Sequence, residues 1–196
     1  MKAMVKIKDN AVLFNDKIIQ VIPEDYPENP REWDNLTKMV FFHKRYTLGD
    51  KHNYKSPDDF LKTLQLIKNK IIIAPVYFYN HSGFALNILP FADSWDSGRI
   101  GWIYIKKSVL KKEFGITKET EMQKKAEEIF KAELEEYEQY INGEVYLLII
   151  RDKNTGDIEF SNTYWGCDFR KNGMMEDLMD YMEVDEKTAT EILDEF

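Results

Sequence analysis

The clearest pattern of hydrophobic and polar positions lies in residues 117–142. A stripe recurs there at nearly helical spacing, formed by Met122, Ala126, Ile129, Phe130, Glu133, Leu134, Tyr137 and Ile141. Thr117 can cap the start of such a helix, and Asn142-Gly143 can end it. The pattern predicts one long helix of about 25 residues, which is long enough to span a small domain.

Shorter apolar runs predict strands. Residues 71–79 form a continuous apolar run, which is typical of a central strand, and Pro75 is expected to place a bulge or an unpaired edge within it. Further strands are expected at residues 84–91 and 100–105 and, as a hairpin around the turn DKNTGD, at 145–150 and 157–164.

The other segments carry weaker signals. Residues 5–22 alternate imperfectly and contain the turn signals Asp9-Asn10 and Asn15-Asp16, so a hairpin is expected there. Three prolines in residues 23–30 predict an extended loop without regular structure. A helix is expected to start at Ser56-Pro57, because serine suits the cap and proline the first turn. Further expectations are a short strand at 39–43, a helix at 108–114 and two short helices in the last twenty or so residues.

The stretch FADSWDSGRIGWIYIKK, residues 91–107, joins a polar segment to a predicted strand. Residues 93–99 are expected to form one turn, in which Gly98 lets the chain change direction. Gly101 is expected to allow the close approach of a neighbour, and Trp95 and Trp102 to anchor the two sides.

The order of the elements favours one fold class. Strands cluster first, then helices, then strands again, with no alternating β–α rhythm. We therefore predict an α+β fold with a mainly antiparallel sheet, one long helix (about residues 117–142) across a face, and short C-terminal helices. Residues 1–175 are expected to form a single α+β domain, and residues 176–196 an acidic helical appendage.

Negative charge is concentrated near the C-terminal end. The net charge is −8, and residues 176–196 hold nine acidic side chains and one basic side chain, whereas the rest of the chain holds 26 of each. An acidic chain is a poor candidate for binding nucleic acid. The acidic segment could engage a basic protein surface, or it could be the solvated face of a terminal helix.

The composition also bears on the cellular setting. Mean hydropathy is −0.51, and no apolar run reaches the length of about 18 residues that a membrane helix needs. The start MKAMVKIKDN lacks the apolar core of a signal peptide. Cys167 is the one cysteine, so neither an internal disulfide nor a cysteine-rich zinc site is possible. We expect a cytoplasmic protein without a cofactor.

Metal binding is a weak hypothesis. The sequence contains none of the common motifs for phosphate loops, dinucleotides, zinc proteases or serine hydrolases. Histidines and carboxylates that could hold a divalent metal are His43, Asp50, His52, His81, Asp93 and Asp96. Their spacing matches no ligand pattern, and isolated histidines are usually hydrogen-bonded loop residues, so no metal site is predicted.

Nucleophilic catalysis is the second hypothesis. Ser82 and Ser97 each precede a glycine, His81 could serve as a base and Asp96 could orient it. Ser-Gly pairs also make ordinary tight turns, and neighbouring side chains such as His81 and Ser82 rarely face each other productively. A catalytic thiol at Cys167 is less favoured still, because an aspartate follows it.

Aromatic and arginine side chains gather in the predicted loops. The set comprises Arg31, Trp33, Asp34, Arg45, Tyr46, Trp95, Asp96, Arg99 and Trp165. Flat apolar rings beside bidentate donors are the materials of a recognition surface, and they could also stack bases. The same residues could be structural, with tryptophans that close the core and Arg–Asp pairs that staple loops. The two interpretations are compatible, because a stapled loop is a preorganised one.

Several of these segments carry a family resemblance. R-E-W-D-N-L, R-Y-x-L-G-D, Y-x-H-S-G and W-D-S-G-x-x-G-x-I-Y occur in this order, within a likeness that runs from about residue 27 to residue 169. The chain resembles an uncharacterised family of small proteins encoded by bacterial phages and related mobile elements. Asp93-Ser94 stands where that family has Cys-Pro, and Tyr164 where it has a cysteine, so a role built on cysteine is in doubt.

The resemblance implies a setting rather than a reaction. It indicates an accessory gene of a phage or integrated element that acts in the host cytoplasm. Small acidic accessory proteins of this kind often bind and block host defence nucleases or other host proteins. This implication is an analogy of context, which does not by itself establish function.

Three functional hypotheses follow. The leading one is a phage or mobile-element protein that binds a host protein, such as a nuclease or CRISPR-type defence system, through the aromatic–arginine loops and the acidic helices. The alternative is a small-molecule or nucleotide-binding protein or hydrolase, whose pocket comprises His81, Ser82, Trp95, Asp96, Ser97 and Arg99 and could include His43 and Asp50. The third, single-strand nucleic-acid binding, needs a basic groove that the neutral body does not obviously provide.

Overall fold

The chain forms two compact units in a computed structural model, which describes residues 4–8, 10–93 and 95–196. One unit contains residues 1–27 and 143–196, and we call it the terminal unit. The other contains residues 28–142, and we call it the inserted unit. Asp9 of the first expected turn and Ser94 of the polar stretch lie outside the described residues. The predicted α+β class, with antiparallel sheets and one long helix, is confirmed.

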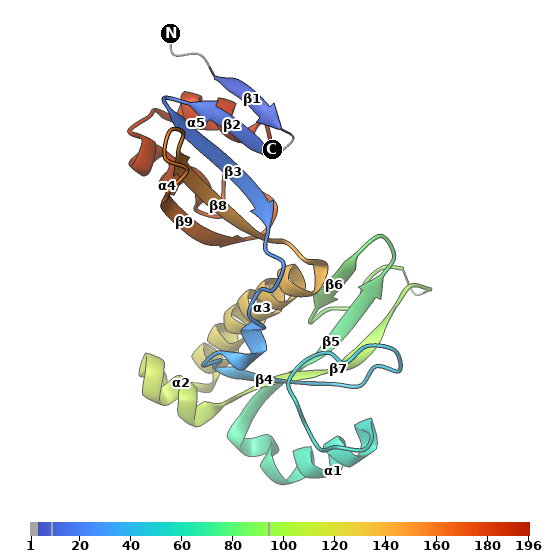
Figure 1. The fold of residues 1–196 in the computed structure, drawn as a ribbon. Coiled ribbons are helices and arrows are strands. Elements are labelled where there is room, and N and C mark those ends of the chain that lie inside the picture. The colour runs from blue at the N-terminus through green and yellow to red at the C-terminus, as the bar shows by residue number, and fades with distance from the viewer. Residues whose placement is uncertain (1–3, 9, 94) are drawn as a thin grey trace. The chain divides into compact units, whose positions relative to one another are not determined.

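The terminal unit is a five-stranded antiparallel sheet with two helices on one face. Its strand order is β1 (Val5–Lys8), β2 (Ala11–Phe14), β3 (Lys17–Pro23), β8 (Val145–Asp152) and β9 (Ile158–Trp165). Strands from opposite ends of the chain, blue and orange in Figure 1, therefore lie side by side at the β3–β8 pair. The described part of residues 5–22 forms three strands rather than the expected single hairpin, because β2 pairs antiparallel with both β1 and β3.

The C-terminal helices belong to the core of the terminal unit. Helices α4 (Met174–Met182) and α5 (Glu186–Leu193) bury Leu178, Ile192 and Leu193 against Ile19, Leu148 and Ile150 of the sheet. The structure therefore divides the chain differently from the expected domain and appendage. The acidic side chains of these helices lie mostly on the outer face, while the apolar stripe between them faces the sheet.

The inserted unit is a four-stranded antiparallel sheet with helices on both faces. Its strand order is β4 (Thr37–Phe41), β7 (Ser97–Lys106), β5 (Ile71–Asn80) and β6 (Phe84–Asn87). Helix α1 (Pro57–Ile67) buries Phe60 on one face, against Val40 and Trp102. Short elements complete the unit: the 3-10 turns Pro30–Glu32 and Lys68–Lys70 and helix α2 (Lys107–Phe114).

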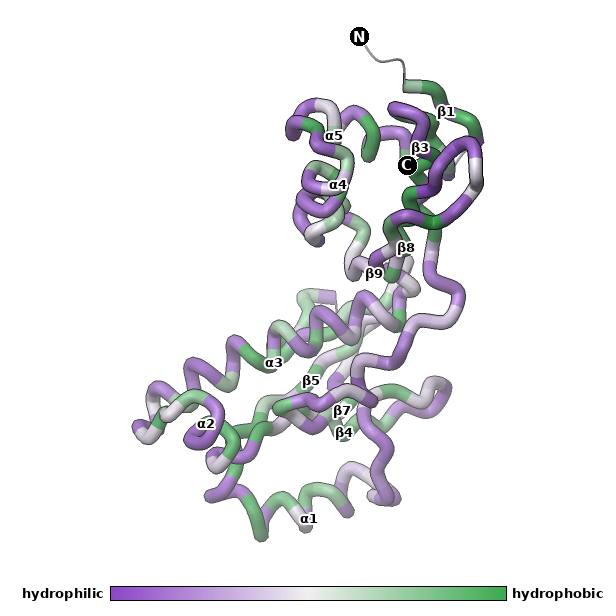
Figure 2. Tube along the Cα trace, turned by 60° about the vertical axis from the view of Figure 1, so that its left-hand side comes forward, coloured by the Kyte–Doolittle hydropathy of each residue, from purple (hydrophilic) through white to green (hydrophobic). Residues whose placement is uncertain are grey.

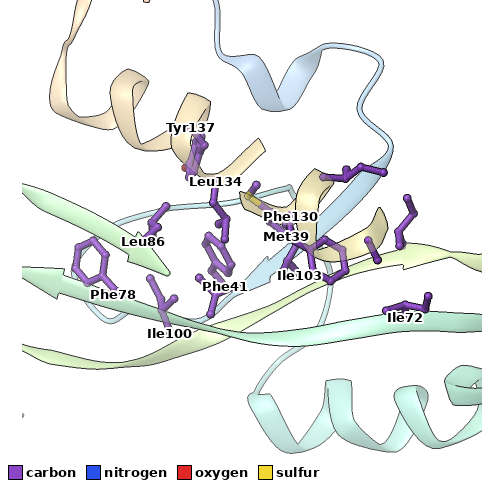
Figure 3. Packing of buried hydrophobic residues seen from close by; sticks show 14 of the residues in the cluster. Met39, Phe41, Ile72, Phe78, Leu86, Ile100, Ile103, Phe130, Leu134 and Tyr137 are labelled. Atoms are coloured by element: carbon purple, nitrogen blue, oxygen red, sulfur yellow. The ribbon is translucent and has the colours of Figure 1, made fainter. Parts of the chain in front are cut away.

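Helix α3 (Glu119–Asn142) covers the other face of this sheet. Figure 3 shows Phe130, Leu134 and Tyr137 pointing from the helix towards the sheet, where they meet side chains such as Met39 and Phe41. Polar and apolar residues alternate along the turns of this helix (Figure 2), as its predicted stripe requires. The helix begins at Glu119, two residues after the expected cap.

Several local predictions are confirmed in the inserted unit. The Ser56 side chain accepts the N–H of Asp59 and caps α1, and the helix expected at 108–114 is α2, which is followed by Gly115 with φ of 67°. At Pro75 one side of β5 is unpaired, because β6 joins only from Tyr77 onwards, and a register shift follows between Val76 and Tyr77.

Other local predictions are wrong. Residues 97–99 are not part of a turn but the start of β7, where Gly98 pairs with Phe78. Strand β6 ends at Asn87, because the chain leaves the sheet before Pro90. The proline-rich segment also contains a short 3-10 turn at Pro30–Glu32, whose first position a proline can occupy.

Candidate functional site

An open groove in the inserted unit brings together five of the predicted site residues. It encloses about 340 Å³ and is lined by Phe42, His43, Phe78, Asn80, Trp95, Asp96, Ser97, Gly98, Arg99 and Ile100. The strand pairing explains this convergence, because the end of β5 pairs with the start of β7 and β4 leads into the loop that carries His43. The groove is the candidate site.

Trp95 is the most exposed large side chain at the groove. Its exposed fraction is 95%, whereas that of Trp102 is 7%. The backbone N–H of Trp95 donates to Asp93 Oδ1 at 2.8 Å, and the indole is left exposed. The expectation that both tryptophans anchor the strand therefore holds for Trp102 alone.

Arg99 and His43 form the polar walls of the groove. The Arg99 guanidinium lies 4.9 Å from the centre of the Trp102 ring, a cation–π geometry that steadies an exposed arginine. His43 Nδ1 accepts the backbone N–H groups of Arg45 and Tyr46, and its ring stacks on Tyr46 at 5.0 Å. Both side chains are thereby preorganised at the surface.

His81 and Asp96 form a solvent-exposed pair at the rim of the groove. His81 Nδ1 lies 3.0 Å from Asp96 Oδ2, with side-chain exposures of 66% and 42%. The Ser97 hydroxyl donates to the carbonyl of Asp93 rather than to an imidazole. Ser82 is exposed and does not line the groove. The residues expected for nucleophilic catalysis are thus close together without a serine–histidine hydrogen bond.

Arg31 and Asp50 lie in a buried cluster, away from the groove. The Arg31 side chain is 2% exposed, and it binds both Asp50 oxygens at 3.2 Å and Glu133 Oε2 at 2.7 Å. Asp50 also accepts the N–H of Met39, and Glu133 accepts those of Leu36 and Thr37. This cluster ties the proline-rich loop, β4 and α3 together, so the geometry favours the stapling interpretation for these two residues.

The electrostatics of this cluster follow from its hydrogen bonds. Burial acts to lower the pKa of Arg31, but the hydrogen bonds to Asp50 and Glu133 outweigh it and raise that pKa. Glu133 is not among the residues that the sequence predicted for the site. The signal for it was present, since it is a carboxylate within the otherwise apolar stripe of the long helix.

The remaining predicted site residues are dispersed. Trp33 is 40% exposed and its indole N–H donates to Glu28, and Asp34 is exposed beside it. Trp165 ends β9 in the terminal unit. They therefore do not belong to the groove.

The described residues show neither a metal cluster nor a membrane span. Over residues 4–8, 10–93 and 95–196, no group of three or more His, Cys, Asp or Glu side chains has the geometry to hold a metal ion. Within the same part of the chain, no helix is both long and apolar enough to cross a bilayer. Cys167 is an exposed free thiol.

No family model, no curated protein and no solved structure matches the chain.

Proposed function

We propose that this chain is a binding protein that recognises another protein through the groove beside Trp95. The observation that carries the proposal is the 95% exposure of the Trp95 indole. Tryptophan is among the residues that dominate binding energy when a partner buries them. An exposed indole in the lining of a groove therefore favours a surface that is completed by another molecule.

Other features of this part of the inserted unit support the proposal. Leu89, in the same connection between β6 and β7 as Trp95, is 64% exposed. The lining of the groove combines apolar side chains, among them Phe42, Phe78 and Ile100, with the charged side chains of Asp96 and Arg99. An apolar centre with a polar rim is the usual composition of a protein interface.

The resemblance supplies a hypothesis about the partner. If the chain is an accessory protein of a phage or mobile element, its partner is a protein of the host cytoplasm, and a defence nuclease is one such target. This part of the proposal rests on the resemblance alone, whereas the binding surface rests on the groove.

A pull-down with a matched control tests the proposal. The tagged full chain, Trp95→Ala and Leu66→Ala are each incubated with bacterial lysate, and recovered proteins are quantified by mass spectrometry. Leu66 is 83% exposed on α1 and does not line the groove, so Leu66→Ala controls for nonspecific hydrophobic binding. We expect a protein that the wild type and Leu66→Ala recover equally and that Trp95→Ala recovers about tenfold less, since a hot-spot truncation costs about 2 kcal/mol or more. Equal recovery by all three proteins would contradict the proposal.

Small-molecule binding is a second candidate, favoured by the convergence of His43, Asp96, Ser97 and Arg99 on one groove. A panel of nucleotides in a thermal-shift assay tests it, because a ligand at 100 times its Kd adds about 2.7 kcal/mol to stability. The same shift with Arg99→Ala as with the wild type would count against the groove as the site.

A further inference from the structure

The edges of the inserted sheet are capped by side chains of the unit itself. At the outer side of β4, Asp50 Oδ2 accepts the N–H of Met39 at 2.7 Å, and His52 Nε2 lies 2.9 Å from the carbonyl of Phe41. Sheet edges offer unpaired N–H and C=O groups to other chains, and proteins usually block them. At β4 the loop after the strand does so.

The opposite edge, β6, is capped by the last turns of α3. The Asn142 side chain binds both the N–H and the C=O of Phe84 at 2.8 Å, as a neighbouring strand would. Glu138 accepts the N–H of Leu86 at 2.6 Å. Both edges of this sheet are therefore blocked from within.

In the terminal sheet, one of the two edges is also protected. The edge strand β1 carries Lys6 and Lys8, and its register with β2 shifts between them. Lysines and bulges on an edge discourage pairing with another chain, because they add charge and twist.

The fourth edge, β9, is less protected: its register shift lies before Phe160, and over residues 160–165 one outward N–H, that of Thr163, is accepted by a side chain among the described residues. The N–H of Gly166 donates to the carbonyl of Glu144 on the β8 side. Because the direction of the backbone N–H and C=O groups alternates along a strand and the register is regular here, those of Phe160, Asn162 and Tyr164 also point towards β8. Those of Ser161 and Thr163 then point away from the sheet. Among the described residues, one hydrogen bond is made by these outward backbone groups: the Thr163 N–H donates to Asn162 Oδ1. From residue 160 to 165 the strand contains no charge and no proline, and its register with β8 does not shift.

The charge around this edge indicates what would bind there. By sequence, the terminal unit holds 18 acidic and 9 basic residues, a net charge of −9, whereas the inserted unit holds 17 and 18, a net charge of +1. Asp177 of α4 lies beside β9, where its Oδ2 accepts hydrogen bonds from Asn162 and Tyr164. Glu159, at the start of β9, is already paired with Lys17. A second copy of the chain would bring like charge to this edge, whereas a basic segment is attracted to it.

We propose that β9 is the docking edge for an extended, lysine- or arginine-rich segment of a partner protein, which joins the terminal sheet as a further strand. The N–H and C=O of Ser161 and the C=O of Thr163 would supply the ladder, as in other cases of strand addition, and the Thr163 N–H would join it by exchanging Asn162 Oδ1 for the new strand. Asp177 would face basic side chains on the α4 side of the new strand. The proposal does not depend on the Trp95 groove, which belongs to the other unit.

A substitution pair on β9 tests the proposal in the full chain. The Ser161 N–H points away from β8, so Ser161→Pro removes a docking donor while it preserves the β8–β9 ladder. Ser161→Ala retains that donor and is the matched control. The probe is a short synthetic peptide in which lysine alternates with valine, and thermal unfolding of each variant checks that the fold is intact.

Residue-resolved amide exchange and binding titrations provide the readouts. We expect the peptide to slow exchange at the Ser161 N–H of the wild type. Ser161→Pro should bind the peptide about tenfold more weakly, and Ser161→Ala should bind it like the wild type. Asp177→Asn should weaken binding about two- to fivefold at low salt. Trp95→Ala should leave it unchanged, which separates this test from that of the proposed function.

Three results would overturn the inference. One is equal affinity of Ser161→Pro and the wild type for the lysine peptide. Another is equal binding of a glutamate–valine peptide, which would remove the role of charge. The third is a wild-type dimer in sedimentation that Ser161→Pro converts to a monomer, without binding of the peptide, which would assign the edge to a second copy.

Discussion

Arg31 shows how a residue typical of recognition surfaces can serve the interior. Its guanidinium satisfies two carboxylates and the carbonyl of Thr37 inside the inserted unit. A buried ion pair adds little net stability compared with apolar packing, but the loss of one partner leaves an uncompensated charge in the interior. The main effect of removing Arg31 would therefore be to leave the carboxylates of Asp50 and Glu133 without their cation in the interior.

We predict that Arg31→Met lowers the free energy of unfolding of the inserted unit by about 3 to 5 kcal/mol. Lys62→Met, which replaces an exposed cation on α1, should change it by less than about 0.5 kcal/mol. Urea unfolding followed by amide exchange in β4 and β7 measures both effects. Wild-type stability in Arg31→Met would show that the cluster is not a staple.

Tyr164 links the stability of the terminal unit to alkaline pH. Burial, and then its hydrogen bond to Asp177, raise the pKa of the Tyr164 phenol above its ordinary value. A group whose folded pKa is raised contributes stability that is complete below the unfolded pKa, about 10 for tyrosine. That contribution is lost as the pH rises through the folded value.

We predict two effects of Tyr164→Phe. At neutral pH it should destabilise the terminal unit by about 1 to 2 kcal/mol, because the hydrogen bond to Asp177 is lost. Above about pH 10 the variant should lose less further stability than the wild type, because the buried phenol is gone. Urea titrations between about pH 8 and pH 11 test this, with Tyr26→Phe, at a position 91% exposed, as the control. Parallel profiles for all three proteins would refute the assignment.

At the scale of elements, β7 carries two glycines with different roles. A Cβ added at Gly101 would lie 2.1 Å from the carbonyl oxygen of Val40, in the neighbouring strand β4. A Cβ added at Gly98 would meet nothing within 4 Å. The expected close approach at Gly101 is therefore confirmed, whereas the expected turn at Gly98 is not.

These two positions make a matched pair of substitutions. Gly101→Ala should cost about 3 kcal/mol or more, because backbone must move to admit the methyl group. Gly98→Ala should stay within about 0.5 kcal/mol of the wild type, because its methyl group enters open space. Thermal unfolding of both variants provides the measurement, and a larger loss in Gly98→Ala would contradict the strand geometry.

Elements were predictable where the determining signal was local. Ser56-Pro57 and the stripe of residues 117–142 gave α1 and α3, because capping and helical spacing act within a few turns. Membership of a sheet was not predictable in this way. β3 pairs with β8 across more than 120 residues, and nothing local to Ile19 indicates Ile150 as its partner. The buried position of Arg31 has the same cause, since Glu133 lies 102 residues away.

At the scale of the whole molecule, residues 176–196 carry much of the negative charge and also part of the hydrophobic core of the terminal unit. The acidic composition of residues 176–196 suggested a solvated appendage. The apolar residues between those acids, among them Leu178 and Ile192, complete the core of the terminal unit. Composition thus described the outer face of these helices and not the inner one.

We predict that deletion of residues 176–196 unfolds the terminal unit and leaves the inserted unit folded. The deletion removes fully buried side chains such as Leu178 and Ile192 from one core only. A charge-only variant, Glu176→Gln with Asp180→Asn and Glu183→Gln, should keep both units folded, because these side chains are exposed. Amide exchange resolved by peptide distinguishes the two results, and protected β3 and β8 in the deletion variant would contradict the prediction.

The division of the terminal unit between both ends of the chain sets an order for its biosynthesis. Lys17 of β3 pairs with Asp152 of β8, 135 residues later, so a nascent chain leaves β3 without its partner for on the order of ten seconds at ordinary translation rates. The inserted unit is continuous in sequence and can fold on the ribosome during that interval. During that interval the apolar side chains of β2 and β3 lack their core partners from the later part of the chain, so this segment is exposed to aggregation and is a candidate for chaperone binding.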